Sequence, residues 1–325
     1  MGINRDKPDE WKKDIAKSVD LYNTWFMNFA PVAFRKTRKL TARQVTEALA
    51  STKNLTAIGP EVLKNNPSVL PMLRMSTCPP IARDRLVGLA GVSKNLVECM
   101  EDSKNCRIPP RMKVEQLDED LAKIGAIITK MADPDIFVWL DKKQDPVEEE
   151  INRAATIVAD RLCGAISDPI IRNAQEQRQL AAISAWLDKK GYTQTMPGKG
   201  IKFNQMTPGT YAFRMNIPVK ISSSGDSNRN VNIPVDVVIM PKNASPRDFP
   251  ILIEAKSAGD FTNVNKRRKE EAQKMNQLKG SFGNDIKFGL FLCGYFDSGY
   301  LGYEAAEGID WVWEHRIDDL DKYGL

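Results

Sequence analysis

Residues 234–240 read PVDVVIM, and residues 249–256 read FPILIEAK. Both runs are rich in Val and Ile and are bounded by Pro, Asn and Ser, which predicts two buried strands joined by a short connection. Side chains alternate between the two faces of a strand, so Glu254 and Lys256 share a face. If the strands are neighbours, Asp236 lies beside that pair. An unpaired charge in a buried strand costs free energy. The presence of Asp236, Glu254 and Lys256 in these strands therefore indicates a chemical role.

Two carboxylates on neighbouring strand ends make an oxygen-rich site for a hard divalent cation, Mg²⁺ above all. We therefore predict that Asp236, Glu254 and Lys256 are catalytic. Asp236 and Glu254 are expected to bind the metal, with the main-chain carbonyl of Ala255 as a further ligand. Lys256 can position and help deprotonate a water molecule, and it can offset charge on an attacked phosphate. The alternative is a simple cross-strand ion pair between Glu254 and Lys256.

A basic helix is predicted after this strand, because Val264, Ala272, Met275 and Leu278 fall near helical spacing. Its first turns contain a cluster of basic residues: Lys266, Arg267, Arg268 and Lys269. Cations at this end oppose the helix dipole, so they are not placed for helix stability. They suit a DNA phosphate backbone beside the metal site. A solvated basic face is the alternative.

The pattern Pro-Val-Asp followed by Glu-Ala-Lys resembles the PD-(D/E)xK nuclease signature, with one residue between Pro234 and Asp236. The run 253–280, together with FLCGYFDSGYLGYE at 291–304 and GIDWVWEHR at 308–316, resembles the XamI family of type II restriction endonucleases. The resemblance is strongest over residues 165–325. It implies a Mg²⁺-dependent homodimer that cuts both strands of a short palindrome in double-stranded DNA. In nucleases of this fold a helix before the sheet can lend a carboxylate to the metal, and Glu176 matches that position; a surface Glu is the alternative.

The expected fold class is α/β, with a PD-(D/E)xK core around a mixed central sheet in residues 166–325. Residues 1–165 are expected to be mostly helical and to serve DNA recognition or dimerisation. A helix is predicted over residues 147–190 with an interruption at Asp168-Pro169, and further strands over 211–221 and 286–293. Residues 85–96 have the pattern of a helix-turn-helix with Gly91 in the turn, and an ordinary helical hairpin is the alternative.

The composition narrows the remaining classes of partner, metal site and cellular compartment. The 325 residues carry a net charge of +5, which is compatible with a nucleic-acid partner. Five scattered Cys and a single His, without a C-x-x-C pair, argue against a zinc site and favour reduced thiols in a cytoplasm. The family resemblance implies that this cytoplasm is that of a prokaryotic cell. No apolar run approaches the ~18 residues of a membrane span. No nucleotide cofactor is expected.

The favoured function is a type II restriction endonuclease that leaves 5′-phosphate ends. One rival is a DNA repair or junction-cleaving nuclease of the same fold, although the long helical half favours target recognition. The other rival is a non-catalytic DNA-binding protein. A pure binder has no need of the Asp236, Glu254 and Lys256 set, so that set separates the two classes.

Overall fold

The computed structural model describes residues 2–142, 144–195, 202–221, 229–245, 248–260 and 264–325. The chain divides into two units: one combines Met1–Phe29 with Arg172–Leu325, and the other is Ala30–Ile171. We call them the sheet unit and the helical unit. The long helices α1 (Pro8–Ser51) and α8 (Glu148–Lys189) each contribute residues to both units. An α/β architecture with a helical N-terminal region is thereby confirmed, whereas the roles assigned to residues 1–165 stay a prediction.

The sheet unit is built on a six-stranded mixed sheet whose strands follow one another in sequence order. The strands are β1 (Thr193–Gln194), β2 (Thr210–Ile221), β3 (Arg229–Met240), β4 (Ile251–Ala258), β5 (Phe288–Gly294) and β6 (Asp310–Trp313). Strand β3 pairs antiparallel with β2 and β4, and the other neighbours are parallel. Val237 pairs with Ile253. The predicted adjacency of the Asp236 and Glu254 strands is confirmed.

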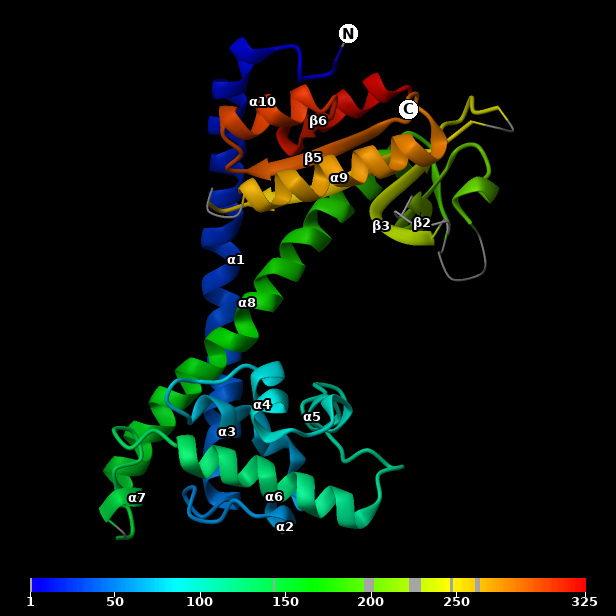
Figure 1. Ribbon diagram of the computed structural model, residues 1–325. Helices are drawn as coiled ribbons and strands as arrows, with labels where there is room; N and C mark the ends of the chain where they lie inside the picture. The colour runs from blue at the N-terminus through cyan, green and yellow to red at the C-terminus, as the bar shows by residue number, and fades with distance from the viewer. Residues whose placement is uncertain (1, 143, 196–201, 222–228, 246–247, 261–263) are drawn as a thin grey trace. The chain divides into compact units, whose positions relative to one another are not determined.

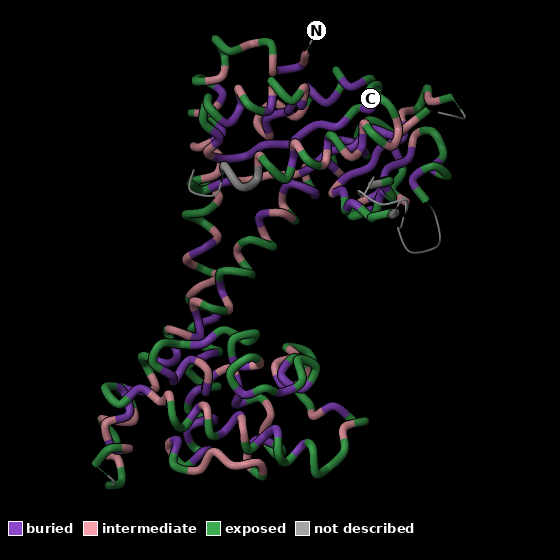
Figure 2. The backbone as a smooth tube through the Cα atoms, in the orientation of Figure 1, coloured by how far each residue is buried: buried purple, intermediate pink, exposed green. Residues whose placement is uncertain are grey.

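Helices cover both faces of this sheet. Parallel strands need crossover connections, and here α9 (Val264–Phe282) joins β4 to β5 while α10 (Ser298–Ala306) joins β5 to β6. One core packs Leu252 and Leu290 with Leu278 of α9, and the core on the other face packs Ile253 with Ile183 of α8. In Figure 1, α9 and α10 lie along β5 and β6, and Figure 2 shows buried residues following the strands. Alternation therefore directs even-numbered residues of β4, Glu254 and Lys256 included, toward α9.

An irregularity in the β2–β3 ladder lies beside Asp236. Phe213 pairs with Val237 and Met215 pairs with Val235, while Arg214 between them has a φ of 53°. A non-glycine residue in this left-handed region is strained, and such residues concentrate at functional sites. The last described pairing between β3 and β4 is Val237 with Ile253. Asp236 therefore occupies the point where β3 leaves β4.

The helical unit contains short helices between its portions of α1 and α8. They are α2 (Pro60–Asn65), the 3-10 turn η1 (Pro67–Val69), α3 (Leu70–Met75), α4 (Arg83–Ala90), α5 (Lys94–Met100), α6 (Val114–Met131) and α7 (Trp139–Lys142). The predicted helix pair is present as α4 and α5, and Gly91 adopts the left-handed conformation between them. The Ser93 side chain makes no capping bond. Within the described ranges, no helix is long and apolar enough to cross a membrane.

The predicted interruption at Asp168-Pro169 is wrong, because α8 continues through Pro169. A proline in a helix interior removes a hydrogen bond and costs about 3 kcal/mol or more. Residues on both sides of it are buried: Val158 and Leu162 in the core of the helical unit, and Leu180 and Ile183 in a core of the sheet unit. Packing at both ends of α8 outweighs the local cost. Two further 3-10 segments, η2 (Phe203–Gln205) and η3 (Glu314–Tyr323), complete the sheet unit.

Candidate functional site

Asp236, Glu254 and Lys256 come together where β3 and β4 separate. The Oδ2 atom of Asp236 accepts a hydrogen bond of 2.9 Å from the main-chain N–H of Ala255. Nζ of Lys256 donates to Oε1 of Glu254 at 3.1 Å. The Asp236 carboxylate thus takes the place of a ladder partner for β4. This geometry follows from the strand alternation, which brings Glu254 and Lys256 to one face, and from the departure of β3.

The electrostatics of this cluster are those of a crowded, partly dry site. Glu254 is only 4% exposed and Asp236 is half-buried. Burial and then the negative charge of Glu254 raise the pKa of Asp236 to about 6, against the opposing effect of Lys256. Burial alone lowers the pKa of Lys256, but the neighbouring carboxylates, Glu254 first and then Glu271, bring it above its usual value. A divalent cation relieves the repulsion between two such carboxylates.

The oxygen atoms of the cluster suit a hard cation. Oε2 of Glu254 is buried and has no hydrogen-bond partner among the described residues, whereas Oε1 accepts from Lys256 and, at 2.6 Å, from Lys274. The N–H and C=O of one strand residue lie on the same edge, so the Ala255 carbonyl faces the gap that holds Asp236. In the described ranges, no group of three or more Asp, Glu, His or Cys is placed to hold a metal. A metal here depends on two carboxylates, a carbonyl and water, the hard oxygen donors that Mg²⁺ prefers.

Glu176 does not join the described contacts of this cluster. Its Oε1 lies 2.7 Å from a guanidinium nitrogen of Arg214. Arg214 sits between the residues that pair on either side of Asp236, so Glu176 is one side chain removed from the site. The side chains of Arg214 and Glu176 are 57% and 38% exposed, and exposed ion pairs of this kind contribute little stability. The Glu176 carboxylate is thus paired with Arg214.

The four basic residues predicted to contact DNA all lie in the first turns of α9. The side chains of Lys266 and Arg267 lie outside the described residues. The Arg268 guanidinium carbon is 3.5 Å from the ring centre of Tyr303, a cation–π contact. Lys269 is exposed beside a hollow of about 540 Å³. The hollow is lined by Lys220 and by α9 residues: Lys269, Ala272, Gln273, Asn276, Gln277 and Gly280.

Three further residues, which were not predicted from the sequence, contact this cluster. Lys274 of α9 contacts the cluster directly, Glu271 lies 3.8 Å from Nζ of Lys256, and Gln179 of α8 donates to the main-chain oxygen of Lys256 at 3.2 Å. Glu271 precedes Met275 by four residues and so belongs to the buried stripe of α9. A charged residue within an apolar stripe was the available signal for Glu271. No comparable signal existed for Gln179.

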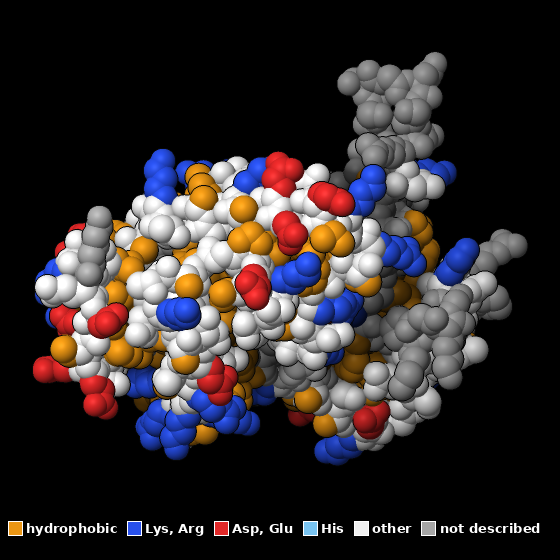
Figure 3. Space-filling view, turned by 90° about the horizontal axis from the view of Figure 1, so that it is seen from below, with side chains coloured by type: hydrophobic (Ala, Val, Ile, Leu, Met, Phe, Trp, Pro, Cys, Tyr) orange, Lys and Arg blue, Asp and Glu red, His pale blue; other side chains and the backbone are white. Residues whose placement is uncertain are grey.

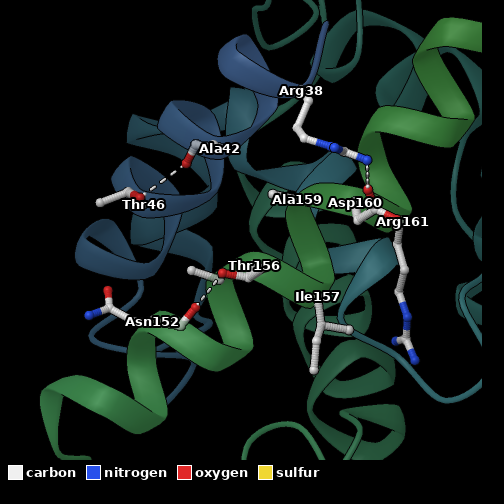
Figure 4. Close-up of a pocket in the computed structure, with 10 residues that line it drawn as sticks. Arg38, Ala42, Thr46, Asn152, Thr156, Ile157, Ala159, Asp160 and Arg161 are labelled. Atoms are coloured by element: carbon white, nitrogen blue, oxygen red, sulfur yellow. Dashed lines mark hydrogen bonds and ion pairs between the residues drawn. The ribbon is translucent and has the colours of Figure 1, made fainter. Parts of the chain in front are cut away.

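The helical unit offers a different kind of surface. A hollow of about 810 Å³ is lined by residues of α1 and α8 within this unit (Figure 4). Arg38 and Asp160 form an ion pair of 2.8 Å there, and both side chains are more than half exposed. None of the predicted catalytic or metal-binding residues lines it. On the face drawn in Figure 3, the described residues present both basic and acidic side chains.

Comparisons with known proteins agree on one class. The family model described as XamI restriction endonuclease matches residues 53–313. The type II restriction enzyme SalI of Streptomyces albus G is 55% identical over 322 residues, which cover 99% of this chain and 99% of that protein. Among solved structures, protein VC1899 from Vibrio cholerae matches with 12% identity and a TM-score of 0.25, over 90% of this chain and 55% of that one. A TM-score this low carries no argument about the fold.

Proposed function

Because this chain belongs to the XamI restriction endonuclease family and is a type II restriction endonuclease, we propose that Asp236, Glu254 and Lys256 are its catalytic residues. The observation that carries the proposal is the convergence of these three residues at the gap between β3 and β4. We further propose that the sheet unit is a PD-(D/E)xK core. The supporting feature is a mixed sheet in which the Asp strand and the Glu-x-Lys strand are neighbours.

The proposed cofactor is Mg²⁺, held by Asp236, Glu254 and the carbonyl of Ala255. When bound, such a cation lowers the pKa of a water molecule and stabilises negative charge on a phosphate. The Lys256 ammonium donates hydrogen bonds, so it can hold the attacking water and offset the charge that develops on the phosphate. The water oxygen bonds to phosphorus as the 3′ oxygen leaves. This in-line hydrolysis gives 5′-phosphate and 3′-hydroxyl ends.

The proposed substrate is double-stranded DNA with a short palindromic target, cut by a homodimer. One set of Asp236, Glu254 and Lys256 occurs per chain, yet a double-strand break needs two hydrolyses. A two-fold symmetric dimer offers the same site to each strand and matches a palindrome by symmetry. Lys266, Arg267, Arg268 and Lys269 are proposed to contact phosphates, and residues 1–165 to recognise DNA or to form the dimer.

Near-isosteric substitutions test the catalytic assignment: Asp236→Asn, Glu254→Gln and Lys256→Met. Single-turnover cleavage should fall by at least about 10³-fold in each, because each removes an interaction that stabilises the transition state. DNA binding measured without metal should stay within about threefold, since ground-state contacts remain. Cleavage near the wild-type rate in any of the three contradicts the assignment of that residue.

Glu176→Gln is the companion variant for the metal site. If Glu176 releases Arg214 and binds the metal during cleavage, the variant loses activity and needs more Mg²⁺ for half-maximal cleavage. If Glu176 serves only Arg214, cleavage and Mg²⁺ requirement stay at wild-type values. An unchanged Mg²⁺ requirement in this variant, beside a raised one in Glu254→Gln, limits the metal set to Asp236, Glu254 and Ala255.

A further inference from the structure

Two carboxyl groups are buried against each other behind Lys256. Glu271 of α9 is 1% exposed and Glu304 of α10 is 0% exposed. The Tyr300 hydroxyl donates to Oε2 of Glu271 at 2.6 Å, and Oε1 of Glu271 lies 3.8 Å from Nζ of Lys256. The charge of Glu271 acts on Glu304, which belongs to the neighbouring helix α10. A continuous set of contacts therefore leads from α10 to the ammonium of Lys256.

This pair of carboxyl groups needs a shared proton. Both oxygens of Glu304 and Oε1 of Glu271 are buried without a hydrogen-bond partner among the described residues. Two ionised carboxylates facing each other in a dry interior would be costly. Burial and then the charge of Glu271 raise the pKa of Glu304 to about 9, against the opposing effects of Tyr300 and Arg268. Glu304 therefore keeps its proton at neutral pH and can donate it to the Glu271 carboxylate.

We propose that Glu271 is a positioning residue for Lys256, and that protonated Glu304 and Tyr300 hold the Glu271 carboxylate in place. This inference rests on the proposed catalytic role of Lys256. Lys256 has two anionic neighbours, and Glu254 has competing tasks because it also accepts from Lys274 and faces the proposed metal. Among the described residues, Glu271 forms no ion pair other than the one with Lys256. It is the anion that keeps the ammonium of Lys256 directed at the gap while Glu254 binds the cation.

If Glu304 carries the shared proton, the isosteric substitutions Glu304→Gln and Glu271→Gln should affect cleavage differently. In Glu304→Gln, the amide N–H replaces the carboxyl proton as the donor to Glu271, so kcat should stay within about threefold of wild type. In Glu271→Gln, the anion facing Lys256 is lost, and kcat should fall about 10²-fold, the effect of misplacing a catalytic group. The KM should stay within about threefold, because neither residue faces the DNA. Glu304→Leu cannot donate and should resemble Glu271→Gln.

The test measures plasmid cleavage with Mg²⁺, DNA binding without metal, and thermal unfolding for these variants beside Lys256→Met. Impaired Glu271→Gln with active Glu304→Gln supports the proposal. Wild-type cleavage by Glu271→Gln overturns the positioning role, and equal impairment of both Gln variants overturns the shared proton. Lys256→Met separates this inference from the proposed function: if that variant cleaves normally, the catalytic assignment itself fails.

A spectroscopic readout keeps the proposal testable even if Glu304→Leu does not fold. Infrared spectra of the wild-type protein at neutral pH should contain a carbonyl band of a buried protonated carboxylic acid. Glu304→Gln should lack this band while keeping its fold and its cleavage. Absence of the band in the wild-type protein, or its persistence in Glu304→Gln, overturns the assignment of the proton to Glu304.

Discussion

At the scale of single residues, the chemistry rests on charges that are buried together. Glu254 accepts hydrogen bonds from Lys256 and Lys274 through the same oxygen, and its other oxygen has no partner among the described residues. Removing one member of a buried ion pair leaves the other charge uncompensated. Oε2 of Glu254 accepts no hydrogen bond among the described residues, and the Asp236 carboxylate is nearby. A bound cation would offset the negative charge of both carboxylates. This arrangement supports the proposed binding of a hard cation.

The first prediction at this scale concerns the metal. Cleavage should stop in EDTA and return with excess Mg²⁺ or Mn²⁺, because the proposed donors are all oxygen atoms. A chelator selective for zinc should have no effect, since the proposed set contains no Cys or His. The measurement is plasmid linearisation on agarose gels, and linear product formed in EDTA would contradict the metal requirement.

The second prediction concerns Glu304 and stability. Its pKa is raised from 4.5 to about 9, so between these values the folded protein holds a proton that the unfolded chain releases. The contribution of Glu304 to the free energy of unfolding of the wild-type protein therefore falls as pH rises, by up to about 1.4 kcal/mol per pH unit for one proton. The Glu304→Gln variant has no carboxyl group at this position, so it neither binds nor releases this proton on unfolding. Its stability relative to wild type should rise from acid to alkaline pH in urea titrations, and a constant difference would show that Glu304 ionises normally.

At the scale of secondary-structure elements, α9 joins two tasks on two of its faces. Its inner face carries Glu271 and Lys274 into the site, and its first turns carry the basic residues. One helix can do both because residues three and four apart share a face, while those between them face elsewhere. The contact of Arg268 with Tyr303 ties the basic turn to α10. The proposed phosphate contacts and the proposed catalytic residues are thereby linked through one helix.

The prediction for α9 uses the salt dependence of DNA binding. Lys266→Gln with Lys269→Gln should weaken binding to all sequences about equally and reduce the slope of log K against log salt by roughly one to two. Cleavage should fall mainly through weaker binding. Lys189→Gln with Lys202→Gln, exposed residues outside both α9 and residues 1–165, is a control with the same change in net charge. An altered cleavage sequence with an unchanged slope would show that the α9 residues read bases instead.

At the scale of the whole molecule, one catalytic cluster per chain has to account for two cuts. A homodimer acting within one encounter should convert supercoiled plasmid to linear product with little nicked intermediate. Light scattering of the complex should give twice the chain mass plus the mass of the DNA duplex. A monomer that releases nicked circles as its main product would refute the dimer.

Four of the five cysteines report on the packing of both units. Cys78 and Cys106 are exposed, whereas Cys163 and Cys293 are buried. Burial raises the pKa of Cys293 to about 12, so its thiol is both inaccessible and protonated. Iodoacetamide should modify Cys78 and Cys106 in the native protein, and Cys163 and Cys293 only after unfolding. Peptide mass spectrometry measures the order, and early modification of Cys293 would contradict its place in the sheet.

Local sequence patterns were enough to predict strands β3 and β4 and to place Asp236, Glu254 and Lys256 on them. Alternation with a period of two and bounding Pro, Asn and Ser are properties of a few neighbouring residues, so they can be read without the fold. They placed Glu254 and Lys256 on one face and made Asp236 their neighbour, and the register of β3 with β4 agrees. The short strand β6 was missed, since its buried Trp311 and Trp313 alternate with residues that are equally buried.

Tertiary structure alone decided the surroundings of those three residues. Glu271 and Glu304 are far enough apart in sequence that only the docking of α9 against α10 can bring their carboxyl groups together. The same holds for Gln179, whose contact with β4 depends on how α8 covers the sheet. Side-chain alternation is set by backbone geometry within one element, whereas burial, shared protons and the pKa of a carboxyl group depend on what packs against it. The sequence by itself therefore determined which residues could do the chemistry, and the tertiary structure decided which charges and donors surround them.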